Sequence, residues 1–301
     1  MKISGFTFIR NGIKLKYPFI ESIRSILPVC DEMIVVVGKS DDGTREAITK
    51  IGSPKIIVID TIWDESLRTG GKILAQQTDI AFSAISGDWG FYLQGDEVVH
   101  EQDLPKIVAA AEKYHIDQRV DGLLFSYHHF YGNYHNISKP NTRGTYPFEV
   151  RMIKKNKLIR SFRDAQGFRK FPSPESILQQ LVPERLQVIK IPAHIFHYGK
   201  VRGPKDELER YKDFHKLWHN DEWVRIHTGN RAEFEYQPNY PLVPFKSSHP
   251  EVMKERIEKL DWDFQYNPAT VAVPMRHRFM NLLEQTTGLR PFDFRNYEIL
   301  K

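Results

Sequence analysis

Short apolar runs alternate with amphipathic stretches over the first hundred residues, and this alternation constrains the fold more than any other feature of the chain. The apolar runs have strand length and end in polar turns. They cover residues 3–9, 33–37, 55–60 and 89–93. The intervening stretches carry apolar residues at helical spacing. Strands that alternate with helices predict βαβ units and a mainly parallel, Rossmann-like α/β sheet.

The strand pattern continues past residue 120 and then changes. Further strand-like segments lie at residues 122–127, 149–153, 188–191 and 194–198. From about residue 203 the chain consists of helical pieces rich in Trp, Tyr, His and Pro. We therefore predict an α/β domain over residues 1–205 and a mostly helical C-terminal extension over residues 206–301.

Charge and composition restrict the class of partner. The chain has 301 residues, of which 41% are hydrophobic, so it can bury a full core. A net charge of +5 and an isoelectric point near 9.0 favour anionic partners such as nucleotides, anionic lipid or acidic glycans. The charge is spread along the chain, which argues against nucleic acid.

Targeting and redox signals are weak. A single cysteine, Cys30, excludes an internal disulfide and fits a reducing compartment. The first residues have no signal-peptide pattern, and no apolar run reaches the ~18 residues of a membrane span. We expect a cytoplasmic protein. Its charge allows peripheral association with the inner face of an anionic membrane. The sequence also leaves open whether the protein forms a homodimer.

Two adjacent carboxylates follow the fourth predicted strand. Residues 89–93 form a continuous apolar run, the turn Gln94-Gly95 ends it, and Asp96 and Glu97 come next. Open α/β sheets bind ligands just beyond the carboxyl ends of their strands. Hard oxygen ligands there suit Mg²⁺ or Mn²⁺, which suit a substrate diphosphate. A solvated acidic turn is the alternative for an Asp-Glu pair considered alone.

Three landmarks, in this order, resemble the family-2-type glycosyltransferases with a GT-A fold, especially bacterial enzymes that build surface polysaccharides. The first strand ends in Arg10-Asn11-Gly12, residues 34–44 look like "VVDxGSxDGT", and residues 87–97 look like "GDWxLxLDADE". The resemblance covers residues 3–199. It implies metal-dependent, inverting transfer of a sugar from a nucleotide-diphosphate donor to a saccharide or lipid-linked saccharide acceptor.

The first departure from the family pattern concerns the nucleotide base. The family's aspartate that contacts the base falls at Val37 or Gly38 in this chain. Base recognition must therefore come from elsewhere, and the adjacent Asp41, Asp42 or the backbone are the candidates.

The second departure concerns the metal motif. Its first aspartate falls at Gln94 and its second at Asp96. The resemblance implies that Asp96 holds the metal, with Glu97 as a supporting neighbour, and that Gln94 contacts a ribose hydroxyl. One negative charge is lost, so we expect weak metal affinity. A late histidine completes the family's metal shell, and we favour His197, since strand alternation turns His194 to the opposite face.

The remaining candidates concern the diphosphate and the proton transfer. The resemblance places a basic residue near the diphosphate, and Lys72 fits it better than Arg68. Arg10 is placed to contact the nucleotide, although each of these cations also fits a solvated surface position. An inverting transfer needs a carboxylate base. We assign that role to Asp164 ahead of Glu149.

Histidines and aromatic residues crowd residues 128–135. Adjacent histidines on a strand point to opposite faces, and no cysteine or HExxH motif accompanies them, so a zinc site is disfavoured. We predict an acceptor-binding loop whose aromatic rings stack on sugars, namely Tyr127, Phe130, Tyr131 and Tyr134.

Other functions fit the residues less well. A sugar nucleotidyltransferase would carry a glycine-rich loop after the first strand, and a dinucleotide-dependent oxidoreductase would carry GxGxxG there. Neither pattern is present. The serious alternative is a glycosyltransferase-like binding or scaffold subunit that has lost turnover, which would account for Gln94 and for the missing base-contacting aspartate.

Overall fold

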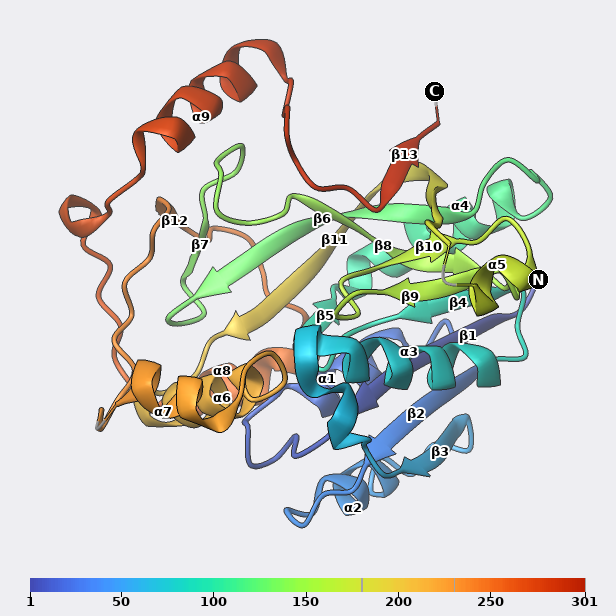
Figure 1. Ribbon diagram of the computed structural model, residues 1–301, viewed down its shortest axis with the longest axis horizontal. Helices are drawn as coiled ribbons and strands as arrows, with labels where there is room; N and C mark the ends of the chain where they lie inside the picture. The colour runs from blue at the N-terminus through green and yellow to red at the C-terminus, as the bar shows by residue number, and fades with distance from the viewer. Residues whose placement is uncertain (180, 230, 301) are drawn as a thin grey trace.

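One mixed β-sheet forms the centre of the molecule, with helices on both faces (Figure 1). The computed structural model describes residues 1–179, 181–229 and 231–300, apart from the side chains of Arg68, Thr69 and Thr270. Along the sheet the strands are β3 (Ile56–Thr61), β2 (Glu32–Gly38), β1 (Ile3–Ile9), β4 (Trp89–Tyr92), β8 (Phe148–Lys154), β6 (Gly122–Tyr131), β11 (Glu184–Lys200), β10 (Gly167–Lys170) and β9 (Ile159–Phe162).

Short strands extend this sheet at its margins. Strands β5 (Glu97–Val99) and β13 (Tyr297–Ile299) both pair with β11. Strand β7 (Asn136–Ser138) joins β6 to β12 (Leu242–Pro244). The helices are α1 (Phe19–Ile26), α2 (Thr44–Thr49), α3 (Lys72–Ala84), α4 (Leu104–Tyr114), α5 (Pro174–Leu178), α6 (Pro204–His215), α7 (Asp221–Thr228), α8 (Lys254–Glu258) and α9 (Met275–Thr287).

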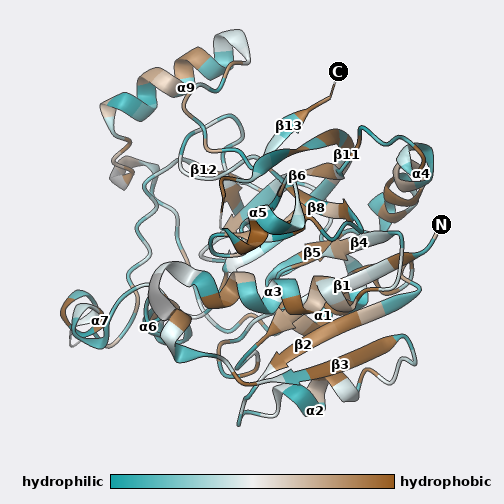
Figure 2. Cartoon of the chain, turned by 45° about the vertical axis from the view of Figure 1, so that its right-hand side comes forward, coloured by the Kyte–Doolittle hydropathy of each residue, from teal (hydrophilic) through white to brown (hydrophobic). Residues whose placement is uncertain are grey.

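The predicted βαβ units are confirmed in the first hundred residues. Strands β3, β2, β1 and β4 are parallel neighbours, and α1, α2 and α3 connect them in sequence. Strands β2, β1 and β4 are mostly apolar and buried because both faces of the sheet are covered there, whereas the edge strand β3 is partly exposed (Figure 2). On β2, Val35 and Val37 pack in the core that contains α1, whereas Ile34 and Val36 pack in the core that contains α3.

The later strands make the sheet mixed. Strand β8 runs antiparallel to both of its neighbours, β4 and β6. The two segments predicted at 188–191 and 194–198 belong to one long strand, β11, which pairs with β6 in parallel with irregular register between Lys190 and His194. That irregularity explains why the sequence reads as two separate strands.

The expected acceptor-binding loop at residues 128–135 is not formed. Strand β6 continues through Tyr131, and Phe130, Tyr131 and Tyr134 are almost fully buried. Phe130 and Tyr134 pack in a third core with Met253, so these rings belong to the interior and are not exposed to stack on sugars. Two adjacent polar residues, His128 and His129, hid the second half of this strand from an interpretation based on continuous apolar runs.

The C-terminal third wraps around the sheet and returns to it. Helices α6 and α7 lie on one side of the molecule, and α9 stands apart from the sheet (Figure 1). The chain then forms β13, where Tyr297 is buried among residues of the α3-side core. The division at residue 205 therefore stays a prediction. No described helix has both the length and the apolar character that a membrane span requires.

We predict that Tyr297→Ala lowers the free energy of unfolding by about 3 kcal/mol, because it removes a large buried side chain from the core of the α/β domain. The control is Ile299→Ala in the same strand, where the side chain is half exposed and the expected loss is within about 0.5 kcal/mol. Urea unfolding measures both. Equal, small losses would show that the C-terminal segment does not stabilise the domain.

Candidate active site

A pocket of about 580 Å³ lies at the carboxyl ends of β1 and β4. Ligand sites of open α/β sheets lie at this edge. The structure brings five of the residues singled out in the sequence to its wall: Arg10, Gln94, Asp96, Asp164 and His197. They come from four separate parts of the chain.

The other predicted site residues do not line this pocket. Asp41 and Lys72 have exposed side chains. Asp42 accepts hydrogen bonds from two backbone N–H groups, which lower its pKa although partial burial opposes this. Glu97 lies beneath the pocket. The Arg68 side chain is outside the described part of the structure.

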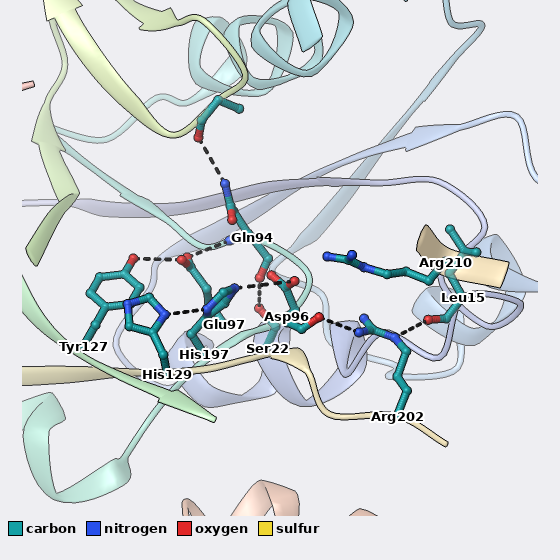
Figure 3. Close-up of polar contacts among 12 residues, drawn as sticks. Leu15, Ser22, Gln94, Asp96, Glu97, Tyr127, His129, His197, Arg202 and Arg210 are labelled. Carbon is teal, nitrogen blue, oxygen red and sulfur yellow. Dashed lines mark hydrogen bonds and ion pairs between the residues drawn. The ribbon is translucent and has the colours of Figure 1, made fainter. Parts of the chain in front are cut away.

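Glu97 forms a completely buried ion pair with Arg151. Arg151 Nε donates to Glu97 Oε2 at 2.7 Å and Nη2 donates to Oε1 at 2.8 Å. The Tyr127 hydroxyl donates to Oε1 at 2.7 Å (Figure 3). Both carboxylate oxygens are thus occupied, and the expectation that Glu97 supports the metal does not fit this arrangement.

Asp96 and His197 face each other across the pocket wall (Figure 3). Asp96 Oδ2 lies 3.7 Å from His197 Nε2. Burial alone would raise the pKa of the Asp96 carboxyl, but His197, Arg202 and Arg210 outweigh it and hold this pKa well below its usual range. Asp96 is therefore ionised under all ordinary conditions.

A chain of hydrogen bonds sets the tautomer of His197. His129 Nε2 lies 2.7 Å from the backbone oxygen of Tyr146, which can only accept, so this nitrogen carries a proton. Burial holds the pKa of His129 well below its ordinary value, so its Nδ1 accepts from His197 Nδ1 at 2.8 Å. When His197 is neutral, this network leaves the lone pair of its Nε2 on the side of Asp96. When His197 is protonated, its Nε2–H faces Asp96 instead and lowers the pKa of that carboxyl.

A divalent cation fits between these two groups. A carboxylate and an imidazole lone pair at 3.7 Å favour a proton or a metal ion between them. Within the described residues, no group of three His, Cys, Asp or Glu side chains is arranged to hold a metal. The remaining ligands would then be diphosphate oxygens and water, as is usual for Mg²⁺.

Two arginines from the segment after β11 add positive charge beside Asp96. Arg202 is buried and donates to the backbone oxygens of Leu15 and Gly199. Arg210, on α6, lines the pocket and extends toward Asp96 (Figure 3). Its Nε has no hydrogen-bond partner among the described residues. Sequence reasoning missed Arg210, because nothing local to α6 indicates that this helix closes the pocket.

Trp63 packs against Gly38, one of the two positions at which the family pattern has its base-contacting aspartate. A Cβ atom on Gly38 would lie 2.4 Å from Trp63 Nε1, so the glycine is needed for the indole to pack there. The guanidinium of Arg10 lies 5.0 Å from the centre of the Trp63 ring. Trp63 Nε1 has no hydrogen-bond partner in the described structure. The replaced aspartate was the signal that could have directed attention to this side chain.

Asp164 lies on a tight loop that hydrogen bonds from Gln94 and Arg151 hold in place. Its neighbours Arg163 and Ala165 both have left-handed φ values, 58° and 61°. Such values cost energy for residues other than glycine and are often found at functional sites. Gln94 Nε2 donates to the backbone oxygen of Ala165 at 3.1 Å, and Arg151 donates to that of Gln166 at 3.1 Å. Burial raises the pKa of Asp164.

Glu149, the second candidate base, lies deeper. It is buried in β8 and does not line the pocket. Its Oε2 makes no hydrogen bond to the described residues. Burial is the main reason that its pKa rises from 4.5 to about 8, although Arg151 opposes the shift. Glu149 is therefore protonated near neutral pH.

Comparison with solved structures finds several similar chains. Residues 1–349 of TarS from S. aureus, in complex with UDP-GlcNAc, match 74% of this chain and 69% of that chain at 15% identity and a TM-score of 0.41. The longer S. aureus TarS matches with a TM-score of 0.39 at 15% identity, over 74% of this chain, which spans only 41% of its length.

A second similar structure is glucosyl-3-phosphoglycerate synthase from Mycobacterium tuberculosis with Mn²⁺, UDP and phosphoglyceric acid. It matches 43% of each chain at 21% identity and a TM-score of 0.28. No curated protein matches the sequence.

The model of the family described as glycosyl transferase family 2 matches residues 17–171, which is more than half of the chain. This match confirms the family, the GT-A fold class and the enzyme class that the three landmarks predict. The chain belongs to glycosyl transferase family 2 and is a glycosyltransferase.

Proposed function

We propose that this chain is a metal-dependent, inverting enzyme that transfers a sugar from a nucleotide-diphosphate donor to a saccharide or lipid-linked saccharide acceptor in surface-polysaccharide synthesis. The observation that carries the proposal is the shared pocket of Arg10, Gln94, Asp96, Asp164 and His197. We further propose that it works in the cytoplasm, at or near the inner face of a membrane.

The donor's nucleotide would lie between β1 and the loop after β3. Trp63 lines the pocket and offers its ring for stacking, and Arg10 adds positive charge beside it. We propose that these two side chains recognise the base, in place of the missing aspartate. Gln94 keeps its amide oxygen for a ribose hydroxyl while its nitrogen holds Ala165.

The diphosphate would lie beside Asp96, His197 and Arg210. A bound Mg²⁺ or Mn²⁺ supplies positive charge that stabilises the departing diphosphate. Asp96 and His197 would hold the ion, and Arg210 provides a second, permanent positive charge from α6. This arginine offsets part of the stabilisation of the diphosphate that is lost if the change from aspartate to Gln94 weakens metal binding.

Transfer would proceed by a single displacement. An acceptor hydroxyl oxygen bonds to the anomeric carbon while the bond from that carbon to the diphosphate oxygen breaks, which inverts the configuration. Positive charge develops on the sugar ring, as in glycoside hydrolysis. Asp164 takes the hydroxyl proton, and its raised pKa makes it a stronger base than an exposed aspartate.

We predict that one nucleoside diphosphate among UDP, GDP, CDP, dTDP and ADP binds by calorimetry in the presence of Mn²⁺, and that Asp96→Ala abolishes the metal-dependent part. The control Asp88→Ala removes an exposed carboxylate near the opposite end of β4 and should bind as the wild type does. If no nucleotide binds with or without metal, the proposed metal-dependent use of a nucleotide-diphosphate donor falls, and a family member that has lost turnover becomes the better interpretation.

We predict that Asp164→Asn lowers kcat by about 10²- to 10⁴-fold, because the acceptor proton loses its base. The affinity for the donor should stay unchanged, since Asp164 acts on the acceptor. Release of the nucleoside diphosphate during turnover measures kcat, and calorimetry measures donor binding. A large loss in Glu149→Gln with normal turnover in Asp164→Asn would reassign the base to Glu149.

We predict that Glu149 makes the protein less stable as pH rises. Its pKa is about 8 in the folded protein against an ordinary value of 4.5, so the folded state binds the extra proton between these values. The free energy of unfolding therefore falls as pH rises through this window, by up to about 1.4 kcal/mol per pH unit. Urea unfolding at a series of pH values should show that the free energy of unfolding falls less steeply with pH for Glu149→Gln than for the wild type. Identical pH dependence in the two proteins would contradict the prediction.

A further inference from the structure

Helix α9 turns its apolar side toward solvent. Met275, Phe279, Leu282 and Leu289 are 80%, 64%, 60% and 63% exposed. Met275, Phe279 and Leu282 recur at spacings of four and three residues and so lie along one side of the helix. Leu289 follows Gly288, whose left-handed φ of 70° ends the helix, and adds an exposed apolar side chain beyond the helix C-terminus. A helix on the surface of a globular protein ordinarily buries such a side against the core.

The opposite side of α9 is polar and packed against the protein. Asn281 and Glu284 are buried. Asn281 Oδ1 accepts from the backbone N–H of Arg143 at 2.7 Å, and Glu284 pairs with Arg290 at 3.1 Å. These contacts fix the rotation of the helix about its axis, so the outward direction of the apolar stripe is set by the fold.

Positive charges border the stripe on both sides. At 100° per residue, Arg276 and Arg278 flank the line from Met275 to Leu282, and both side chains are exposed. Neither forms an ion pair with a described carboxylate, and the only acidic residue of α9, Glu284, is buried. Phe292 extends the apolar surface beyond the helix and is 84% exposed.

We infer that α9 docks the protein on an anionic lipid bilayer. The stripe of Met275, Phe279 and Leu282 would enter the boundary between headgroups and acyl chains, with Arg276 and Arg278 at the headgroups. Amphipathic helices with a basic border bind membrane surfaces in this way. A net charge of +5 on the whole chain acts in the same direction.

Charge complementarity favours a bilayer over a second copy of the chain. A symmetric contact between two α9 helices would pair the same surface on both copies. It would bring the four exposed guanidinium groups together without a carboxylate on the stripe to balance them. Anionic headgroups neutralise the same charges. The inference is independent of the donor and of the metal, so it can fail while nucleotide binding stands.

The test is co-sedimentation of the full chain with phosphatidylcholine vesicles, and with vesicles that also contain phosphatidylglycerol. We expect binding to the anionic vesicles only. Phe279→Ser combined with Leu282→Ser should abolish it. Arg276→Gln combined with Arg278→Gln should weaken it by about 30-fold, at about fivefold for each charge removed.

Matched controls separate this surface from general effects. Lys155→Gln with Lys157→Gln removes the same net charge from exposed positions in the turn after β8, and Ile116→Ser with Leu178→Ser removes two exposed apolar side chains elsewhere. Both controls should bind like the wild type, and all variants should show unchanged thermal unfolding.

Three results would overturn the inference. The wild type could fail to bind anionic vesicles, or the control pairs could lose as much binding as the α9 pairs. Sedimentation velocity could instead reveal a dimer that Phe279→Ser with Leu282→Ser disperses, without any vesicle binding. That last result would make a second copy of the chain the partner of α9.

Discussion

The buried ion pair between Glu97 and Arg151 holds the active-site region together. Two parallel hydrogen bonds join them with no exposure to solvent, and a single charge left there would be strongly destabilising. Glu97 also accepts from the backbone N–H of Gln94, and Arg151 also donates to the backbone oxygen of Gln166. The pair therefore ties the turn after β4 to the loop that carries Asp164.

This arrangement gives two adjacent carboxylates, Asp96 and Glu97, different roles. Asp96 faces the pocket and its cationic neighbours, while Glu97, one residue later, turns beneath the pocket toward Arg151. In the amino-acid sequence alone, Asp96 and Glu97 look like two equivalent acidic residues. Their separate roles come from the tertiary partners, since Arg151 lies on β8 and Arg210, beside Asp96, lies on α6.

Local pattern was enough to predict the first four strands, the helices between them and the family. The family resemblance also brought Asp96, Asp164 and His197 forward as candidates, and all three line the same pocket. Local pattern could not reveal Trp63, His129 or Arg210, whose positions depend on packing between distant segments. It failed for Phe130 and Tyr134, because only the third core around Met253 turns these aromatic residues inward.

The short stretch from Arg143 to Tyr146 contacts both helix α9 and the histidine pair beside the pocket. Arg143 and Thr145 hold α9 and the residues after it, through Asn281 and Arg290. The next residue, Tyr146, provides the carbonyl that orients His129 and, through it, His197. Arg143, which contacts α9, is three residues before Tyr146, whose carbonyl orients His129 and thereby makes His197 Nδ1 the hydrogen-bond donor. Hydrogen bonds and a short segment of backbone therefore form a continuous path from α9 to the pocket.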